Sequence, residues 1–449
     1  MRKEKWIGAV AAAMAGIGLL AGCGSPAASD AYEQERAPVE EVQEAEPEAS
    51  GEQAPEPDGQ LSAPEEETPE PAEEPEEVLP QEPAKTAEEL VEEEVDGILA
   101  EMTLEEKVLQ LFMITPEALT GYETVTAAGD HTRESILQYP VGGIIYFTKN
   151  LREPGQVREM LENTRRYYEE AGYPAPFLGI DEEGGKVARI GKQAAFGVEQ
   201  IGDMRAVGEQ GDPEEAARVG TVIGSYLSEL GFTLDFAPVA DVLTDPDNQV
   251  IGARSFGTDP ALVSDLALEE AKALEEAGIW AVLKHYPGHG ATKSDSHDGY
   301  AYTDKTLEQL MEAELVPFRA GIQEGISFIM AAHISVPEIT GDEVPCSLSP
   351  YMITDVLRGE MGFDGIVVTD ALNMGAVSRQ YSSGDAAVAA LNAGVDLLLM
   401  PVDFQGAYEG VLAAVEEGVL SQEQIEESVR RILRVKCAAE ESRTSDDRE

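Results

Sequence analysis

The sequence predicts an α/β fold in which a parallel sheet closes into a single (β/α)8 barrel. Eight short apolar runs alternate with amphipathic segments of helical spacing. Strands that are apolar along their whole length are covered on both faces, as in parallel sheets flanked by helices. Eight such units in about 350 residues favour a closed, TIM-like barrel over an open doubly wound sheet. The chain has no glycine-rich dinucleotide fingerprint and no Walker motif to support the open sheet.

Residues 1–22 resemble a bacterial lipoprotein signal peptide. Basic residues precede an apolar stretch, Trp6–Leu20, that is shorter than a comfortable membrane span. The sequence LAGC ending at Cys23 matches a lipobox, which implies cleavage before Cys23 and diacylation of its thiol. A chance run of small residues ending in cysteine is the alternative. We expect a chain held by lipid at Cys23 on the extracellular face of the bacterial cytoplasmic membrane.

The charge of the chain is strongly acidic and uneven. The 449 residues contain 87 acidic and 31 basic side chains, a net charge of -56, which repels phosphate backbones and argues against a nucleic-acid partner. Residues 23–85 are rich in Pro and Glu, so we expect a disordered tether there. The barrel is expected at 86–437, with a disordered tail at 438–449. Cys346 and Cys437 are too few for a disulfide framework, so their redox state stays open.

The predicted elements follow in chain order. Residues 86–110 have helical spacing and contain a capping box, Thr103-x-x-Glu106, so a helix or a helical pair enters the domain. Strands are expected at 111–114, 142–147, 177–180, 233–239, 281–283, 328–332, 365–369 and 395–400. Helices are expected at 154–170, 213–229, 260–277, 307–323 and 385–393.

Charged or imidazole side chains follow five successive strands, from the third to the seventh. The carboxyl ends of the strands of a parallel barrel surround one mouth, where TIM-barrel enzymes hold their active sites. A single polar residue after a strand is commonplace, but five in succession predict a functional ring. Its members are Asp181, Asp241, Lys284 with His285, His333 and Asp370.

Two arrangements of these residues are chemically reasonable. In the first, the carboxylate of Asp370 attacks the anomeric carbon of a sugar while an imidazolium, His297, protonates the departing oxygen. Asp295 would stabilise the charged form of His297 and fix its tautomer. In the second, His285 and His289 join Asp295 and His297 as ligands of a divalent metal. The Pro-Gly pair between the first two histidines prevents a helix from aligning them, so the metal site is the less favoured hypothesis.

Five ordered motifs carry a resemblance to a known family. They are DEEGGKVAR at 181–189, DFAPVAD at 235–241, VIGARSF at 250–256, KHYPGHG at 284–290 with DSH at 295–297, and GIVVTDALNM at 365–374. Together they resemble the signature of the glycoside hydrolase family 3 β-N-acetylglucosaminidases. The resemblance covers the barrel from residue 98 to residue 435.

The resemblance implies a retaining exo-β-N-acetylglucosaminidase acting on peptidoglycan-derived or related glycans, with no metal and no cofactor. Asp370 would be the nucleophile, His297 the general acid and then base, and Asp295 the residue that orients His297. By the same matching, the terminal sugar would be held by Asp181, Arg189, Arg254, Lys284 and His285. His289 and His333 have no role in this assignment, and we expect them to be hydrogen-bonding supports.

The resemblance also implies that the acid/base comes from the barrel itself. Many family members append an α/β sandwich domain that supplies the acid/base, whereas the structured-looking part of this chain ends near Cys437, so His297 would supply it from within the barrel.

Two alternatives use the same site. A histidine becomes neutral after giving up its proton and does not repel phosphate, so phosphorolysis, or cleavage of another β-glycoside, stays open. The third hypothesis is a lipoprotein that binds wall glycan without cleaving it, although a pure binder has no need of Asp370 and His297.

Overall fold

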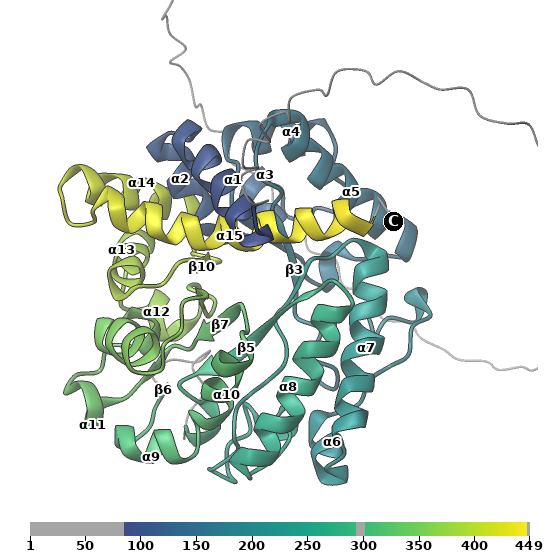
Figure 1. The fold of residues 1–449 in the computed structure, drawn as a ribbon, viewed down its shortest axis with the longest axis vertical. Coiled ribbons are helices and arrows are strands. Elements are labelled where there is room, and N and C mark those ends of the chain that lie inside the picture. The colour runs from purple at the N-terminus through teal and green to yellow at the C-terminus, as the bar shows by residue number, and fades with distance from the viewer. Residues whose placement is uncertain (1–84, 293–300, 447–449) are drawn as a thin grey trace, which may run out of the picture. The chain divides into compact units, whose positions relative to one another are not determined.

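The computed structural model describes residues 85–292 and 301–446, with side chains as far as residue 439 (Figure 1). The predicted signal peptide, the lipidation site Cys23 and the tether as far as residue 84 lie outside these residues, as do Asp295 and His297. None of the helices in the described ranges is both long and apolar enough to cross a membrane.

Eight parallel strands form the sheet, and all eight lie where the sequence predicts them. Their order is β10-β1-β2-β3-β4-β5-β7-β9, which follows the chain around a ring. Hydrogen bonds from Leu397 N to Val367 O (3.1 Å) and from Thr369 N to Leu397 O (3.0 Å) join the two ends of this order. The predicted barrel is therefore confirmed. The strands are β1 (Phe112–Ile114), β2 (Gly143–Ile145), β3 (Phe177–Ile180), β4 (Leu234–Asp235), β5 (Trp280–Tyr286), β7 (Phe328–Ala331), β9 (Ile366–Thr369) and β10 (Leu398–Leu399).

The barrel interior is packed with apolar side chains and requires a glycine at one point. A Cβ on Gly179 of β3 would lie 2.3 Å from Cε of Met113, which fills the space between the strands. Glycine in a strand interior commonly marks such a close approach. Strand β5 extends to Tyr286, three residues beyond its predicted end, so Lys284 and His285 lie within the strand.

Helices surround the sheet (Figure 1) and begin at strong capping signals. In α7 the first residue is Pro213, whose missing N–H is not needed there, and the Asp212 side chain accepts from Glu214 N at 3.1 Å. The longer helices that follow the strands are α5 (Pro154–Ala171), α7 (Pro213–Leu230), α8 (Pro260–Glu276), α13 (Ser383–Ala393) and α14 (Phe404–Glu416).

One predicted helix, 307–323, is divided in the structure. It forms α9 (Leu307–Glu312) and α10 (Val316–Glu324), and the break includes Ala313. Pro317 lies near the start of α10. Its ring would clash with the carbonyl of Ala313, four residues earlier, if one helix continued through both segments.

The remaining elements are short. They are α3 (Pro116–Thr120), α4 (Asp130–Gln138), η1 (Thr148–Asn150), η2 (Ala194–Phe196), α6 (Met204–Gln210), η3 (Gly252–Arg254), η4 (His289–Ala291), β6 (Ala301–Tyr302), β8 (Ile334–Ser335), α11 (Pro337–Thr340), η5 (Cys346–Leu348), η6 (Tyr351–Glu360) and α12 (Gly375–Ser378). Strands β6 and β8 pair in parallel outside the barrel. Cys346 is a buried free thiol, and burial raises its pKa; Cys437 is also buried.

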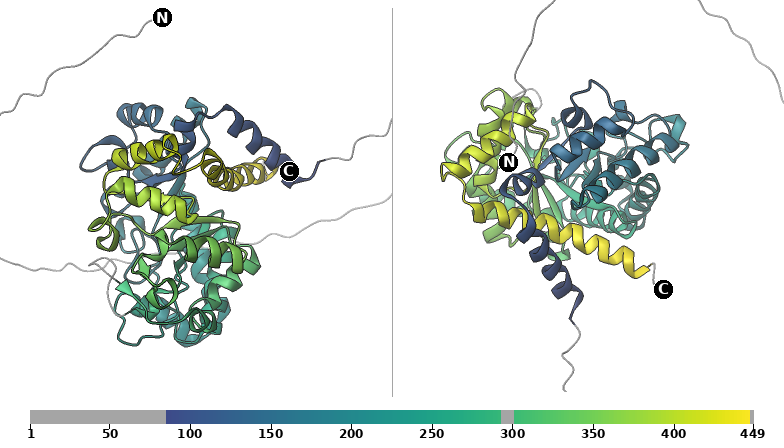
Figure 2. Two further views of the ribbon diagram at one scale, coloured as in Figure 1. Left: turned by 90° about the vertical axis from the view of Figure 1, so that its left-hand side faces the viewer. Right: turned by 90° about the horizontal axis from the view of Figure 1, so that it is seen from above.

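The first and last helices pack together at the amino ends of the barrel strands. Helices α1 (Ala87–Glu101) and α2 (Leu104–Gln110) form the predicted helical pair, each with a capping box. Helix α1 (dark blue) lies beside α15 (Gln422–Asp446, yellow) in Figure 2. Arg430 of α15 forms an ion pair with Asp96 of α1 at 2.7 Å. Helix α15 continues to Asp446, where the sequence predicted a disordered tail from residue 438, because Ala and Glu there still favour a helix.

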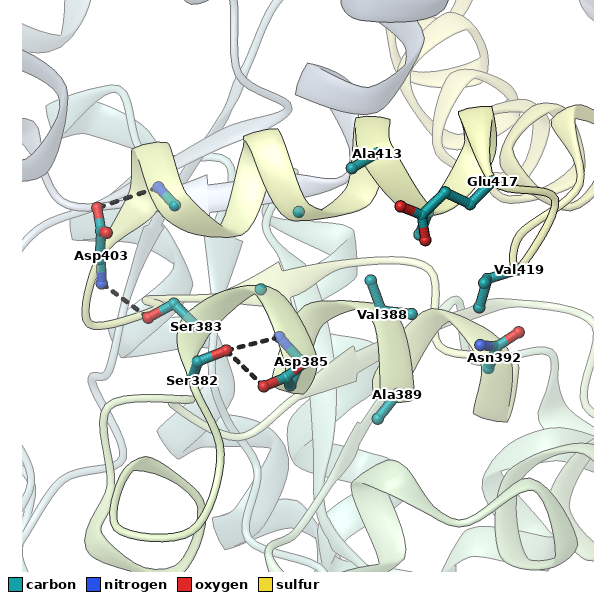
Figure 3. Close-up of a pocket in the computed structure, with 14 residues that line it drawn as sticks. Ser382, Ser383, Asp385, Val388, Ala389, Asn392, Asp403, Ala413, Glu417 and Val419 are labelled. Carbon is teal, nitrogen blue, oxygen red and sulfur yellow. Dashed lines mark hydrogen bonds between the residues drawn. The ribbon is translucent and has the colours of Figure 1, made fainter.

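Helices α13 and α14 approach each other at two glycines. A Cβ on Gly410 would lie 2.7 Å from Cα of Gly384. Each helix is capped by a polar side chain, Ser382 for α13 and Asp403 for α14 (Figure 3). Beside this contact the two helices leave a cavity of about 710 Å³, lined by Val388, Asn392 and Glu417 among others. The close backbone approach explains the glycines in these two helices without a functional role.

Candidate active site

A cavity of about 280 Å³ lies at the carboxyl ends of the barrel strands. Apolar side chains form part of its lining, among them Phe147, Met330 and Met374. The cavity brings together residues at the ends of six strands, β2, β3, β5, β7, β9 and β10, that are far apart in the sequence. All five residues predicted to hold a sugar, and the predicted nucleophile, line it: Asp181, Arg189, Arg254, Lys284, His285 and Asp370.

Lys284 is a buried cation held between two carboxylates. Its side chain is 2% exposed, and Nζ lies 3.1 Å from Asp181 Oδ1 and 2.5 Å from Glu183 Oε1. Burial alone would lower the pKa of this ammonium, but the attraction of Glu183 and Asp181 outweighs burial and leaves its pKa above the usual value. Lys284 therefore stays protonated at the cavity wall.

Glu183 is the centre of this ion network, and it was not predicted as a site residue from the sequence. Arg254 donates to both of its carboxylate oxygens at 2.8 Å, a bidentate pair. Burial raises the pKa of Glu183, but Arg254 and Lys284 together hold it well below the usual range. The sequence did contain a signal for Glu183, which lies in the DEEGGKVAR motif. The predicted site held the cationic side chains of Arg189, Arg254 and Lys284, and cations of this kind can be buried only if carboxylates pair with them.

His285 is oriented by Asp241, which follows β4. The Nδ1 atom of His285 lies 2.6 Å from Asp241 Oδ2, while Nε2 lies 3.3 Å from an Nη atom of Arg254 at the cavity. Asp241 is fully buried and also accepts from His289 N at 2.5 Å. Burial raises the pKa of this carboxyl, but His285 more than offsets burial and the net pKa is lowered. Asp241 thus fixes which ring nitrogen faces the cavity.

Arg189 comes from the loop after β3 and reaches the cavity from its rim. Its Nη2 donates to Asp181 Oδ2 at 3.3 Å, and the guanidinium lies over the Phe147 ring, 5.5 Å from the centroid. The Nε atom is buried, and no hydrogen-bond partner for it is present among the described residues. Arg189 therefore has a donor whose partner is not supplied by the described part of the protein.

Asp370 directly follows β9, as predicted, and its backbone is fixed on both sides. Its N–H donates to Ala331 O at 2.8 Å, and its Oδ1 accepts from Ala371 N at 2.8 Å. His333 supports the same turn, since its Nε2 lies 3.1 Å from Ala371 O and its Nδ1 lies 2.7 Å from Ser347 Oγ. These contacts agree with the expected supporting role of His333 and hold the Asp370 carboxylate at the cavity.

The segment that carries Asp295 and His297 lies outside the described residues, but both of its flanks are anchored. On one side, Asn248 Nδ2 donates to His289 O at 2.8 Å and to Thr292 O at 3.1 Å. On the other side, Lys305 forms an ion pair with buried Glu314. Among residues 85–292 and 301–439, no cluster of three or more His, Cys, Asp and Glu side chains is arranged to hold a metal ion.

Comparison with known proteins places the chain in a family. Residues 103–435 match the model of the glycosyl hydrolase family 3 N-terminal domain. A β-hexosaminidase A of Pseudoalteromonas piscicida is 35% identical over 337 residues, 70% of this chain and 56% of that protein. The β-hexosaminidase LpqI of Mycobacterium tuberculosis is 32% identical over 356 residues, 76% of this chain and 84% of that protein.

A solved structure gives the same result. The structure of a glycoside hydrolase family 3 β-N-acetylglucosaminidase from Paenibacillus sp. str. FPU-7 matches with a TM-score of 0.70 at 38% identity. The match covers 76% of this chain and 63% of that one, so the chain spans less than two thirds of this relative and of the Pseudoalteromonas protein. The resemblance predicted from the five motifs is confirmed, and the chain belongs to glycosyl hydrolase family 3.

Proposed function

We propose that this chain is a retaining exo-β-N-acetylglucosaminidase that hydrolyses terminal β-linked N-acetylglucosamine through a covalent intermediate on Asp370. The observation that carries the proposal is the single small cavity in which the Asp370 carboxylate meets a pre-formed set of charged groups. The β-hexosaminidase relatives support this choice of sugar.

The cavity volume supports cleavage at a chain end. About 280 Å³ is at the small end of ligand sites and suits one sugar ring rather than an extended glycan. Lys284 and Arg254 supply charged donors for sugar hydroxyls, and Asp181 supplies an acceptor. Because these side chains already bind one another, little conformational entropy is lost when the sugar enters, and the anomeric carbon is held in line with Asp370.

The proposed reaction has two steps. An oxygen of Asp370 forms a bond to the anomeric carbon while the bond to the aglycone oxygen breaks, and His297 gives that oxygen its proton. In the second step His297 accepts a proton from water, whose oxygen attacks the anomeric carbon and displaces Asp370. Two inversions give net retention of the anomeric configuration. Asp295 would stabilise His297 while it is charged.

We also propose that the natural substrates are peptidoglycan-derived or related β-N-acetylglucosaminides outside the cytoplasmic membrane. The lipobox at Cys23 supports this location, since a diacylated cysteine would keep the protein at the outer face of that membrane. Metabolic labelling with a fatty-acid analogue tests the anchor: wild-type protein should carry the label and the Cys23→Ala variant should not. Equal labelling of both proteins contradicts lipidation at Cys23.

The experiment that tests the activity is a panel of chromogenic β-glycosides, each assayed with and without phosphate. The N-acetylglucosaminide should be cleaved fastest, and proton NMR should detect β-N-acetylglucosamine as the first product. Sugar 1-phosphate formed only with phosphate would replace hydrolysis by phosphorolysis. Faster turnover of the glucoside would change the substrate assignment, and binding without turnover would favour the non-catalytic lipoprotein.

A further inference from the structure

Glu182 lies between two cavity residues but has a different environment. Asp181 and Glu183 line the cavity, whereas Glu182 does not. Its side chain is 1% exposed, and the described part of the chain contains no ion pair to its carboxylate. A buried carboxylate is costly unless hydrogen bonds replace its water, so its partners reveal what it stabilises.

Four donors converge on the Glu182 carboxylate. Oε2 accepts from Arg189 N at 2.5 Å and from Ile190 N at 2.9 Å, and Oε1 accepts from Gly191 N at 2.7 Å and from Tyr226 Oη at 2.9 Å. Three of these donors are consecutive backbone N–H groups. Such a run of N–H groups forms an anion-binding concavity, and here the anion comes from the chain itself.

Glu182 is fixed from the opposite side by the barrel. Its own N–H donates to Asp235 Oδ1 at 2.8 Å, and Asp235 lies on β4. Tyr226 lies on α7, so the carboxylate is also held by a helix of the outer layer. Glu182 therefore connects residues 189–191 of the loop to two rigid elements. Charge-assisted hydrogen bonds of this kind are about twice as strong as neutral ones.

The loop segment held in this way carries Arg189, whose buried Nε has no partner among the described residues. Gln193 Nε2 donates to Arg189 O at 2.6 Å, so the backbone of this residue is held through both its N–H and its carbonyl. We propose that Glu182 is a positioning residue that sets the backbone at Arg189, so that the guanidinium meets the sugar in the cavity. The inference rests on the proposed role of Arg189 in sugar binding.

A double-mutant cycle on the full chain tests this inference. The variants are Glu182→Gln, Arg189→Ala and the double variant, and kcat and KM are measured separately on the chromogenic N-acetylglucosaminide. Loss of a charged hydrogen bond should make Arg189→Ala raise KM by roughly 10- to 100-fold. Glu182→Gln should raise KM about 10-fold, with kcat changed less than about 3-fold, because one amide N–H then faces backbone donors. In the Arg189→Ala background, Glu182→Gln should cost less than about 2-fold.

Tyr226→Phe is the matched control, since it removes one hydrogen bond from the same carboxylate but none from the loop. Its KM should stay within about 2-fold of wild type. If Glu182→Gln does not fold, Gly191→Ala replaces it, because the added Cβ would lie 3.1 Å from Glu182 Oε1 and displace it. That variant should raise KM about 3-fold, again only when Arg189 is present.

The outcomes separate the inference from the proposed function. Equal losses from Glu182→Gln with and without Arg189 would show a general structural role and overturn the inference, while sugar binding by Arg189 would stand. An unchanged KM in Arg189→Ala would remove Arg189 from the sugar site and overturn both roles. Hydrolysis through Asp370 would still be intact in that case.

Discussion

Lys284 and Lys436 are both buried cations of the barrel, but they lie at opposite ends of its strands. Lys284 is 2% exposed at the carboxyl end of β5 and is paired with Asp181 and Glu183. Lys436 is 6% exposed, and its Nζ donates to Gln110 Oε1 at 2.8 Å and lies 5.0 Å from the centroid of the Phe177 ring. Gln110 precedes β1 and Phe177 begins β3, so these contacts lie at the amino ends of the strands.

The difference shows how one barrel uses charge for two purposes. At the carboxyl ends, carboxylates hold Lys284 charged beside a cavity where a substrate can enter. At the amino ends, Lys436 contacts the Gln110 amide and the Phe177 ring, and its stem packs on the core. In a TIM barrel, residues at the carboxyl ends of the strands serve catalysis, and residues at the amino ends serve stability. Variants at the two ends of the strands should therefore have different effects on activity and on stability.

The largest effect should come from an aspartate at the carboxyl ends. Asp370→Ala should lower kcat on the chromogenic N-acetylglucosaminide by at least about 10⁴-fold, because the covalent step loses its nucleophile. The matched control is Asp396→Asn: Asp396 is fully buried and accepts from Arg358 at 2.5 Å, outside the cavity. It should lose stability and keep kcat/KM within about 2-fold. Normal turnover by Asp370→Ala would contradict the nucleophile assignment.

The two lysines give the next largest contrast. Lys284→Met should lower kcat/KM by about 100-fold or more and the free energy of unfolding by about 3–5 kcal/mol, since the buried Glu183 and the half-buried Asp181 lose a partner. Lys436→Met should keep kcat/KM within about 2-fold and change the free energy of unfolding by less than about 2 kcal/mol. Steady-state kinetics and urea unfolding measure both quantities. Similar losses of kcat/KM in the two variants would contradict the assignment of catalysis to the carboxyl ends of the strands and of stability to the amino ends.

Acid should weaken the carboxyl-end network through Glu183. The pKa of this carboxyl is lower in the folded chain than in the unfolded chain, where it is near 4.5, so its stabilising effect is complete above that pH and disappears as pH falls further. Glu183→Gln should therefore lose about 2–3 kcal/mol of unfolding free energy at pH 7 relative to wild type. The difference should shrink below pH 4.5. Urea unfolding at several pH values would refute this if the difference stayed constant.

The smallest effect should come from Glu275, near the end of α8 that precedes β5. Burial raises the pKa of this carboxyl from 4.5 to about 7, and its Oε1 has no hydrogen-bond partner among the described residues. The folded state therefore favours the protonated form, and stability is lost as pH rises from 4.5 through 7. Glu275→Gln should gain about 1 kcal/mol of unfolding free energy at pH 8 and nothing at pH 4. A loss of stability at pH 8 would show an unrecognised partner.

The eight strands could be predicted because each is an apolar run covered on both faces. The end of β5 could not, because Lys284 and His285 interrupt the apolar run although their strand continues. They remain in the strand because Asp181, Glu183 and Asp241 neutralise them, and those carboxylates come from distant segments. A local pattern does not contain that information.

The site shows the same limit at two adjacent glutamates. Glu182 and Glu183 are identical in the sequence, but one accepts from the loop backbone and the other pairs with Arg254. Which one faces the cavity depends on the path of the following turn, where Gly184 and Gly185 have φ of 84° and 49°. The motifs predicted six of the residues that line the cavity but not Glu183, and the roles of Asp295, His297 and Cys23 stay predictions.

The closure of the barrel has a consequence for synthesis of the protein. Leu398 N donates to Leu111 O at 2.7 Å, so the first strand obtains one of its two neighbours only after almost the whole domain has been made. Until β10 is available, β1 and β9 have unpaired edges, which are sites for association with other chains. A nascent chain that stops after Asp370 would hold this residue at the end of a strand in an open sheet. We therefore expect the pairing of β10 with β1 and β9 to be the last step in closing the barrel.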